Sequence, residues 1–198
     1  MRTFLLMILT ILLVVNANGQ TLFSPVESKL KITKHNDLTD LVCSSSEMAV
    51  KFQLNRKITI LPQKNIVTID GQTILITSLK FGGYKIDIPG QNMNSQKLLL
   101  ETYSKYEQDY FKNELHTELI NPNNQWVVIK SKGWFIWYFK VGHVPIQVAK
   151  ETKIQLFTST IIGDNILTVN APIFVDGDFN KAGLIVNEMM ENLTISKQ

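Results

Sequence analysis

The densest apolar pattern of the chain lies between residues 125 and 171. It consists of four runs rich in β-branched and aromatic residues, with turn residues between them at 132–133 and 163–165. Runs of this kind predict β-strands of one sheet. The predicted strands are residues 125–129, 134–139, 154–162 and 166–169.

All three tryptophans of the chain, including Trp126, lie in this region. Trp134 and Trp137 are three residues apart, and successive side chains of a strand point to opposite faces. The two rings are therefore expected on opposite faces of the sheet. Residues 134–139 are apolar on both faces, which predicts a sheet covered on both sides.

A hairpin is predicted in the first half of the chain. Asp70-Gly71 stands between two β-rich runs, and a type I′ turn requires positive φ at both of its central residues. The polar Gln72 is expected to lengthen this turn by one residue. The strands predicted in this half are residues 48–54, 57–61, 65–69 and 73–77.

Residues 20–45 are interpreted as an N-terminal leader with little regular structure. Pro25 disfavours a helix near its start. Within it, residues 30–32 are expected to form a short edge strand, and residues 37–42 one helical turn.

The hydrophobic period becomes helical between residues 95 and 119. Leu99, Tyr103, Tyr106 and Tyr110 recur at spacings of four, three and four residues, which places them on one face of a helix. Ser95 is the expected N-cap, and Asn121-Pro122 is expected to stop the helix. The acidic residues Glu101, Glu107 and Asp109 are assigned to its solvated face.

The tyrosine-bearing face has two interpretations. The favoured one packs the rings on the sheet, with the hydroxyl groups at its margin. In the other, Tyr103, Tyr106 and Tyr110 line a site for a small apolar ligand, together with Trp134 or Trp137.

A second helix is predicted over residues 179–194, after a loop with a turn at 176–177. Asp176, Asp178 and Asn180 match the start of an EF-hand loop, but Lys181 and Asn187 occupy the positions that require Gly and Glu. We therefore expect Asp178 to be a helix N-cap rather than a calcium ligand. The fold class predicted for residues 46–198 is a single α+β domain, a largely antiparallel sheet with both helices packed on it.

The first 19 residues have the pattern of a secretory signal peptide. Arg2 precedes an apolar run from Phe4 to Val15, and Ala17-Asn-Gly19 resembles a cleavage site. The apolar run is shorter than the roughly 20 residues that a membrane span requires. The predicted mature chain begins at Gln20 and has no integral membrane segment.

Charge and cysteine content limit the function classes further. Removal of residues 1–19 leaves 19 Lys and Arg against 17 Asp and Glu, which does not favour nucleic acid as a partner. Cys43 is the only cysteine, so no internal disulfide is possible, and burial of this thiol is favoured. An exported protein without crosslinks suggests a bacterial periplasm or an extracellular location.

No catalytic or metal-binding motif is found. His35, His116 and His143 are far apart in sequence and form no H-x-x-x-H pair, so neither a metal nor a cofactor is predicted. Cys43 or a serine would need a distant histidine for nucleophilic chemistry. A secreted hydrolase is therefore the least supported function.

The order of the predicted elements is hairpins, a long helix, a tryptophan-bearing hairpin, a further hairpin and a C-terminal helix. This order resembles the PsbP-like α/β/α sandwich over roughly residues 46–195. The resemblance implies an accessory or assembly function and no catalytic residue.

The leading expectation is a non-catalytic envelope protein that binds an envelope protein or another envelope component. The alternative is a carrier of a small apolar ligand, held between the sheet and the tyrosine-bearing helix. A functional surface is expected at the margins of the sheet, around residues 143–145 or 176–178.

Overall fold

The computed structural model describes residues 23–46, 48–63, 65–81, 93–142 and 152–196. The predicted signal peptide, His143 and the margin around residues 143–145 lie outside the described residues.

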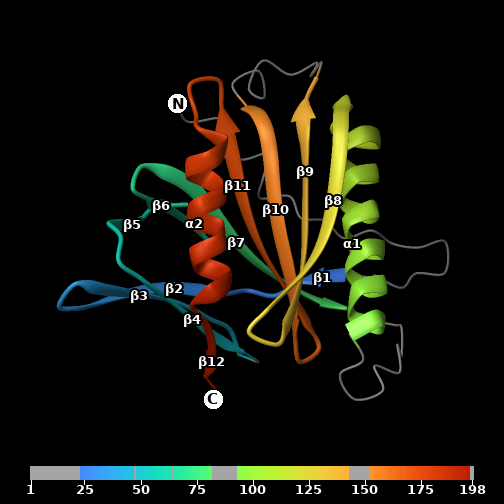
Figure 1. Cartoon of the computed structure of the whole chain (residues 1–198). Coiled ribbons are helices and arrows are strands. Elements are labelled where there is room, and N and C mark those ends of the chain that lie inside the picture. Colours follow the sequence, from blue (N-terminus) through green and yellow to red (C-terminus); the bar gives the residue numbers. More distant parts are fainter. Residues whose placement is uncertain (1–22, 47, 64, 82–92, 143–151, 197–198) are drawn as a thin grey trace.

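The larger of two antiparallel sheets has eight strands (Figure 1). Its central strands are those predicted from the apolar runs of the second half. A short strand, β1 (Phe23–Pro25), pairs with β7 beside the main path. The main path runs in the order β5 (Ile58–Ile60), β6 (Ile66–Ile69), β7 (Gln72–Phe81), β11 (Asn165–Phe174), β10 (Thr152–Ile162), β9 (Lys132–Val141) and β8 (Leu119–Ile129).

A second, four-stranded antiparallel sheet has the order β12 (Leu193–Ser196), β4 (Ala49–Leu54), β3 (Leu38–Ser44) and β2 (Lys29–His35). The described part of the segment interpreted as a leader is therefore largely strand. The helical turn predicted for residues 37–42 is wrong. Leu41 and Cys43 alternate into the core, and Asp40 accepts hydrogen bonds from Lys51 and Gln53 on the neighbouring strand.

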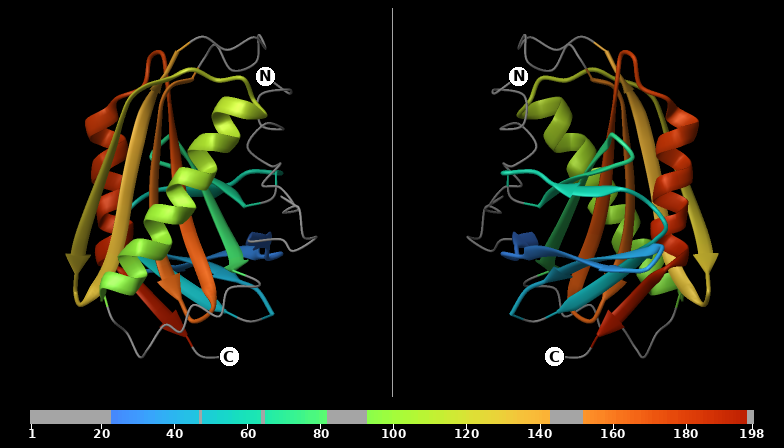
Figure 2. Two further views of the ribbon diagram at one scale, coloured as in Figure 1. Left: turned by 90° about the vertical axis from the view of Figure 1, so that its right-hand side faces the viewer. Right: turned by 90° about the vertical axis from the view of Figure 1, so that its left-hand side faces the viewer.

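Two helices cover opposite faces of the large sheet (Figure 2). Helix α1 (Met93–Asn113) packs over β8, β9 and β10, and helix α2 (Phe179–Glu191) packs over β11 and also contacts β4. Each helix packs on a separate apolar cluster. Trp134 is buried in the α2-side cluster and Trp137 in the α1-side cluster, which confirms the prediction that they lie on opposite faces.

The α+β class is confirmed, and the helix boundaries differ from the predicted ones. Helix α1 begins at Met93, so Ser95 lies inside it and is not the N-cap. It ends at Asn113, and His116 follows with a φ of 48°. Asn121-Pro122 belongs to β8, where a register shift between residues 120 and 123 accommodates the proline. Helix α2 ends at Glu191 because β12 follows.

Two hairpin turns of the large sheet are formed by pairs of residues with positive φ. Asp70 and Gly71 have φ values of 49° and 83°, as predicted, and Gln72 pairs directly with Ile69 instead of lengthening the turn. The β8–β9 turn lies at Lys130 and Ser131, with φ values of 47° and 63°, and not at residues 132–133.

Candidate functional site

The α1 side of the sheet is filled by aromatic rings. Trp137 stacks on Phe157 with ring centroids 3.8 Å apart and planes 3° apart. Tyr103 is fully buried and makes an edge contact with Phe23 at 5.3 Å. The ring of Tyr103 is thus packed as the favoured interpretation expects, but its hydroxyl group is buried rather than at the margin of the sheet.

The five residues predicted for a ligand site are not brought together as one group. Tyr103 and Trp137 share the α1-side cluster, and Tyr106 packs against it. Tyr110 is partly buried and makes an edge contact with Phe111. Trp134 lies on the other side of the sheet, under α2. The structure thus separates Trp134 from the tyrosines by the thickness of the sheet.

Beneath α1 lies a buried acid that the sequence interpretation placed in solvent. Glu107 is only 7% exposed, and burial raises the pKa of its carboxyl group to about 7, although a hydrogen bond from Tyr103 opposes the shift. The hydroxyl of Tyr103 also accepts a hydrogen bond of 3.4 Å from Thr168, which in turn lies 2.9 Å from Ser159. The assignment of Glu107 to the solvated face is therefore wrong.

Burial and the neighbouring carboxylate act on the tyrosines of the same helix. Burial, followed by the charge of Glu107, raises the pKa of Tyr106 to about 12. The same two causes raise the pKa of Tyr103 well above its ordinary value. Both phenols therefore remain protonated at neutral pH, and Tyr103 acts as a hydrogen-bond donor to Glu107.

The thiol and the described histidines do not form a nucleophilic site. Cys43 is buried, and burial raises the pKa of its thiol against the lowering effect of a hydrogen bond with Ser28. Raising this pKa disfavours the thiolate, which is the reactive form. His35 is on the β2–β3 hairpin, 3.5 Å from the carboxylate of Asp40. Within the described residues, no three His, Cys, Asp or Glu side chains are placed to hold a metal ion.

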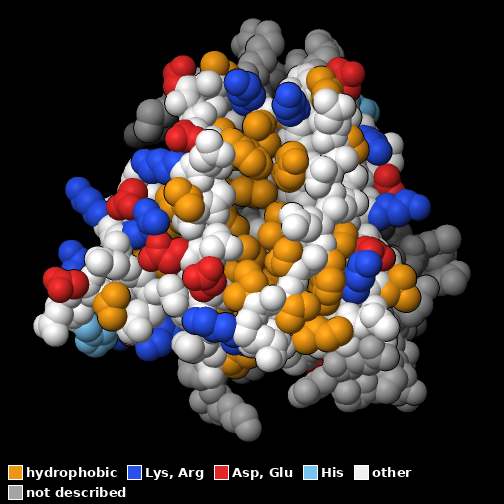
Figure 3. Space-filling view, in the orientation of Figure 1, with side chains coloured by type: hydrophobic (Ala, Val, Ile, Leu, Met, Phe, Trp, Pro, Cys, Tyr) orange, Lys and Arg blue, Asp and Glu red, His pale blue; other side chains and the backbone are white. Residues whose placement is uncertain are grey.

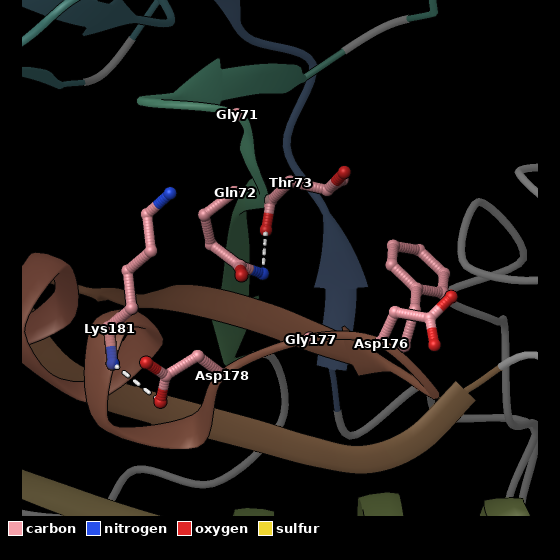
Figure 4. Close-up of a pocket in the computed structure, with 8 residues that line it drawn as sticks. Gly71, Gln72, Thr73, Asp176, Gly177, Asp178 and Lys181 are labelled. Carbon is pink, nitrogen blue, oxygen red and sulfur yellow. Dashed lines mark hydrogen bonds between the residues drawn. The ribbon is translucent and has the colours of Figure 1, made fainter.

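A cavity of about 410 Å³ lies between the β6–β7 turn and the start of α2 (Figure 4). Its acidic residues are the ones predicted as a possible margin site. The Asp178 carboxylate accepts hydrogen bonds from the backbone N–H groups of Asn180 and Lys181, at 2.8 and 3.3 Å, which confirms it as the N-cap of α2. The lining residues are Gly71, Gln72, Thr73, Phe174, Asp176, Gly177, Asp178 and Lys181.

The polar groups around this cavity are largely used to hold α2 against the β6–β7 turn. Lys181 donates a 2.7 Å hydrogen bond to the carbonyl of Asp70, and Gln72 donates to the carbonyl of Pro172 at 2.8 Å. Arg56 pairs with both Asp70 and Glu188. These contacts give the cavity a structural explanation, the attachment of a helix to the sheet.

A different surface has no such explanation. On the α2 side, the helix covers β11 but leaves the strands nearer the β8 edge partly open. Hydrophobic side chains gather between α2 and β8 in the space-filling view (Figure 3). They are only partly buried, although they pack against the α2-side core. We call this surface the α2–β8 face; its strand residues are Val127, Ile129, Ile136, Tyr138 and Ile154.

The flank of α2 that borders this face has a glycine with room for a side chain. Phe179 contacts Tyr138 with ring centroids 5.3 Å apart, and Gly183 lies one turn further along the same flank. A Cβ atom added at Gly183 would meet nothing within 4 Å. Glycine costs a helix interior about 1 kcal/mol relative to alanine, and here no steric demand offsets that cost. Gly183 therefore keeps this border of the α2–β8 face clear.

Comparisons with known proteins add a fold-level likeness. No protein-family model and no curated protein matches the sequence. Among solved structures, the solution structure of cyanobacterial PsbP (CyanoP) from Synechocystis sp. PCC 6803 is similar over 91% of this chain and 96% of that chain, with 8% identity and a TM-score of 0.37. No function or site is transferred from it.

The α2–β8 face could not be predicted from the sequence. The strand pattern predicts that a face is apolar, but it does not predict how far a helix extends across that face. The burial of Glu107 was also missed, although the sequence contains a signal for it, since Glu107 lies four residues after Tyr103 on the same helix face.

No described helix has the length and apolar character that spanning a membrane would require.

Proposed function

We propose that this protein is a non-catalytic, exported binding protein that recognises a partner protein through the α2–β8 face. The observation that carries the proposal is a contiguous apolar surface that neither helix covers, bordered by Gly183. Partly exposed apolar side chains clustered on one face are typical of protein interaction sites. The buried thiol of Cys43 and the aromatic packing beneath α1 both fit a chain that binds at its surface rather than reacting or enclosing a ligand.

A pair of substitutions at the border and in the floor of the face tests the proposal. Gly183→Leu places a side chain in the open space on the flank of α2 that carries Phe179, and Ile136→Lys places a charge among apolar neighbours. The tagged wild type and variants are purified from the native cells, and the proteins that co-purify are compared by mass spectrometry. A partner retained by the wild type is expected to be lost from both variants.

A matched control separates loss of the face from loss of folding. Leu98→Lys changes an exposed leucine on α1, on the opposite side of the sheet, and is expected to leave the partner bound. Circular dichroism melting checks that each variant is folded. Retention of every co-purifying protein by folded Gly183→Leu and Ile136→Lys would contradict the proposal.

Export is a separate part of the proposal and has its own measurement. The n-region, the apolar run and the Ala17-Asn-Gly19 site favour removal of residues 1–19. Intact mass and N-terminal sequencing of protein from the native cells are expected to show a chain that starts at Gln20. A chain recovered with residues 1–19 still present would contradict export by signal cleavage.

A further inference from the structure

The outer edge of the large sheet beyond β8 is unpaired among the described residues. Figure 1 shows β8 as the last strand on this side of the sheet. Exposed edges are usually protected by charges, prolines or bulges, because their free N–H and C=O groups pair with other strands. The first half of β8 has such protection in Pro122 and the register shift before Asn123.

The second half of β8 has none of these protections. Residues 125–129 contain no charge, proline or bulge, and Val128 is 55% exposed. Since Ile129 and Lys132 flank a two-residue turn, the alternation of the ladder directs the N–H and C=O groups of Trp126 and Val128 to the free edge.

From this edge we infer that a second copy of this chain pairs antiparallel with β8, on a two-fold axis at Val127. In this register Trp126 of each copy faces Val128 of the other, and the backbone groups directed to the edge meet as hydrogen-bonding pairs. Aromatic and β-branched residues form favourable cross-strand pairs. Val127 faces its own symmetry mate, and Lys130 faces Asn124, so no like charges are opposed.

The helices leave room for this pairing. Helix α1 makes its most extensive contact with β9, so the two copies of α1 would be separated by three strand spacings, about 14 Å. Packed helices require only about 8–10 Å between their axes.

The pairing changes the α2–β8 face. A two-fold axis perpendicular to the sheet places both α2 helices on the same side of one continuous sheet. Val127 of each copy then lies beside Val127 of the other, with Ile129 of each copy diagonal to that pair, and the two faces form one broad apolar surface between two α2 helices. The inference that this broad surface binds a partner rests on the proposed function. The inference that two copies pair rests on the β8 edge alone.

Sedimentation velocity of the purified protein tests the pairing at about 1 to 100 μM, a range that brackets a micromolar dissociation constant. A dimer is expected for the wild type. Val128→Pro removes only an edge-directed N–H group, which a folded monomer tolerates, and is expected to be monomeric. A wild type that stays monomeric throughout, or a dimer unchanged by Val128→Pro, overturns the inference.

Cysteine substitutions test the register. Val127→Cys places two thiols across the axis, within the range of Cα separations that a disulfide requires, and mild oxidation is expected to give a covalent dimer. Val128→Cys, one residue away, points to the other face and is the matched control. Cross-linking at 128 equal to that at 127 overturns the register. A monomer that still loses its partner on Gly183→Leu overturns the pairing and leaves the proposed function intact.

Discussion

Glu107 places a carboxyl group in the core beneath α1, where it has a phenol rather than a cation as its partner. Its pKa in the folded protein, about 7, is above the ordinary value of 4.5. Between these two pH values the folded state retains a proton that the unfolded state has lost. The contribution of Glu107 to the free energy of unfolding is therefore full below about pH 4.5, falls as the pH rises through this interval, and levels off above pH 7.

Glu107→Gln removes the titration and retains an oxygen that accepts from Tyr103. We expect the variant to be more stable than the wild type at pH 8, by up to about 3 kcal/mol at 1.4 kcal/mol per pK unit, and similar to it at pH 4.5. Urea unfolding across this pH range measures the difference. Glu101→Gln, at an exposed site of α1, is the control and should keep the wild-type slope. The same slope in Glu107→Gln would contradict the account of the buried acid.

Gly183 and Gly71 offer a second comparison, since both have space for a Cβ atom and only Gly71 has a positive φ, of 83°. Gly183→Ala is expected to raise the free energy of unfolding by about 1 kcal/mol through helix propensity. Gly71→Ala is expected to lower it by about 1–2 kcal/mol through backbone strain. Thermal melts of the two variants check the signs. Destabilisation by Gly183→Ala would mean that the glycine serves packing rather than an open border.

At the scale of elements, the start of α2 depends on one side chain. Asp178 satisfies two backbone N–H groups of the first turn, and its removal leaves them without that acceptor. Asp178→Ala is expected to lower the free energy of unfolding by about 1 kcal/mol, and exposed Asp176→Ala by less than about 0.5 kcal/mol. Chemical denaturation measures both. Equal effects of the two substitutions would show that Asp178 acts through charge rather than capping.

Some of these elements could be predicted from the sequence, and others could not. The β6–β7 hairpin followed from Asp70-Gly71, whose conformation only a few residue types adopt readily. Strand β3 was missed because Leu38, Leu41 and Val42 have helical as well as strand spacing. The end of α1 was overextended because Leu115 fits the helical stripe, and the left-handed conformation of His116 leaves no signal in the sequence.

The candidate site was less predictable than the fold. Opposed Trp134 and Trp137 correctly indicated a sheet with two buried faces. How far α2 extends sideways across that sheet depends on its contacts with Arg56 and Asp70, which are distant in sequence. The open α2–β8 face results from that lateral position, so a local pattern cannot reveal it.

For the whole molecule, the two sides of the sheet have different roles in this account. The α1 side is sealed by stacked rings, with a buried acid beneath the helix. The α2 side combines a closed core over β11 with an open apolar face toward β8. The proposed partner, and the second copy inferred at the β8 edge, both use the open half. Stability and recognition are thus placed in different parts of one fold.

The central claim, that a partner binds the α2–β8 face, is tested most directly by site-specific photo-crosslinking in the native cells. Tyr138 lies on the α2–β8 face, and exposed Leu98 lies on α1, on the opposite side of the sheet. A photoreactive residue at position 138 is expected to give a defined adduct with one partner protein, and the same residue at position 98 is expected to give none. Adduct at position 98 alone, or the same adduct from both positions, would contradict the claim.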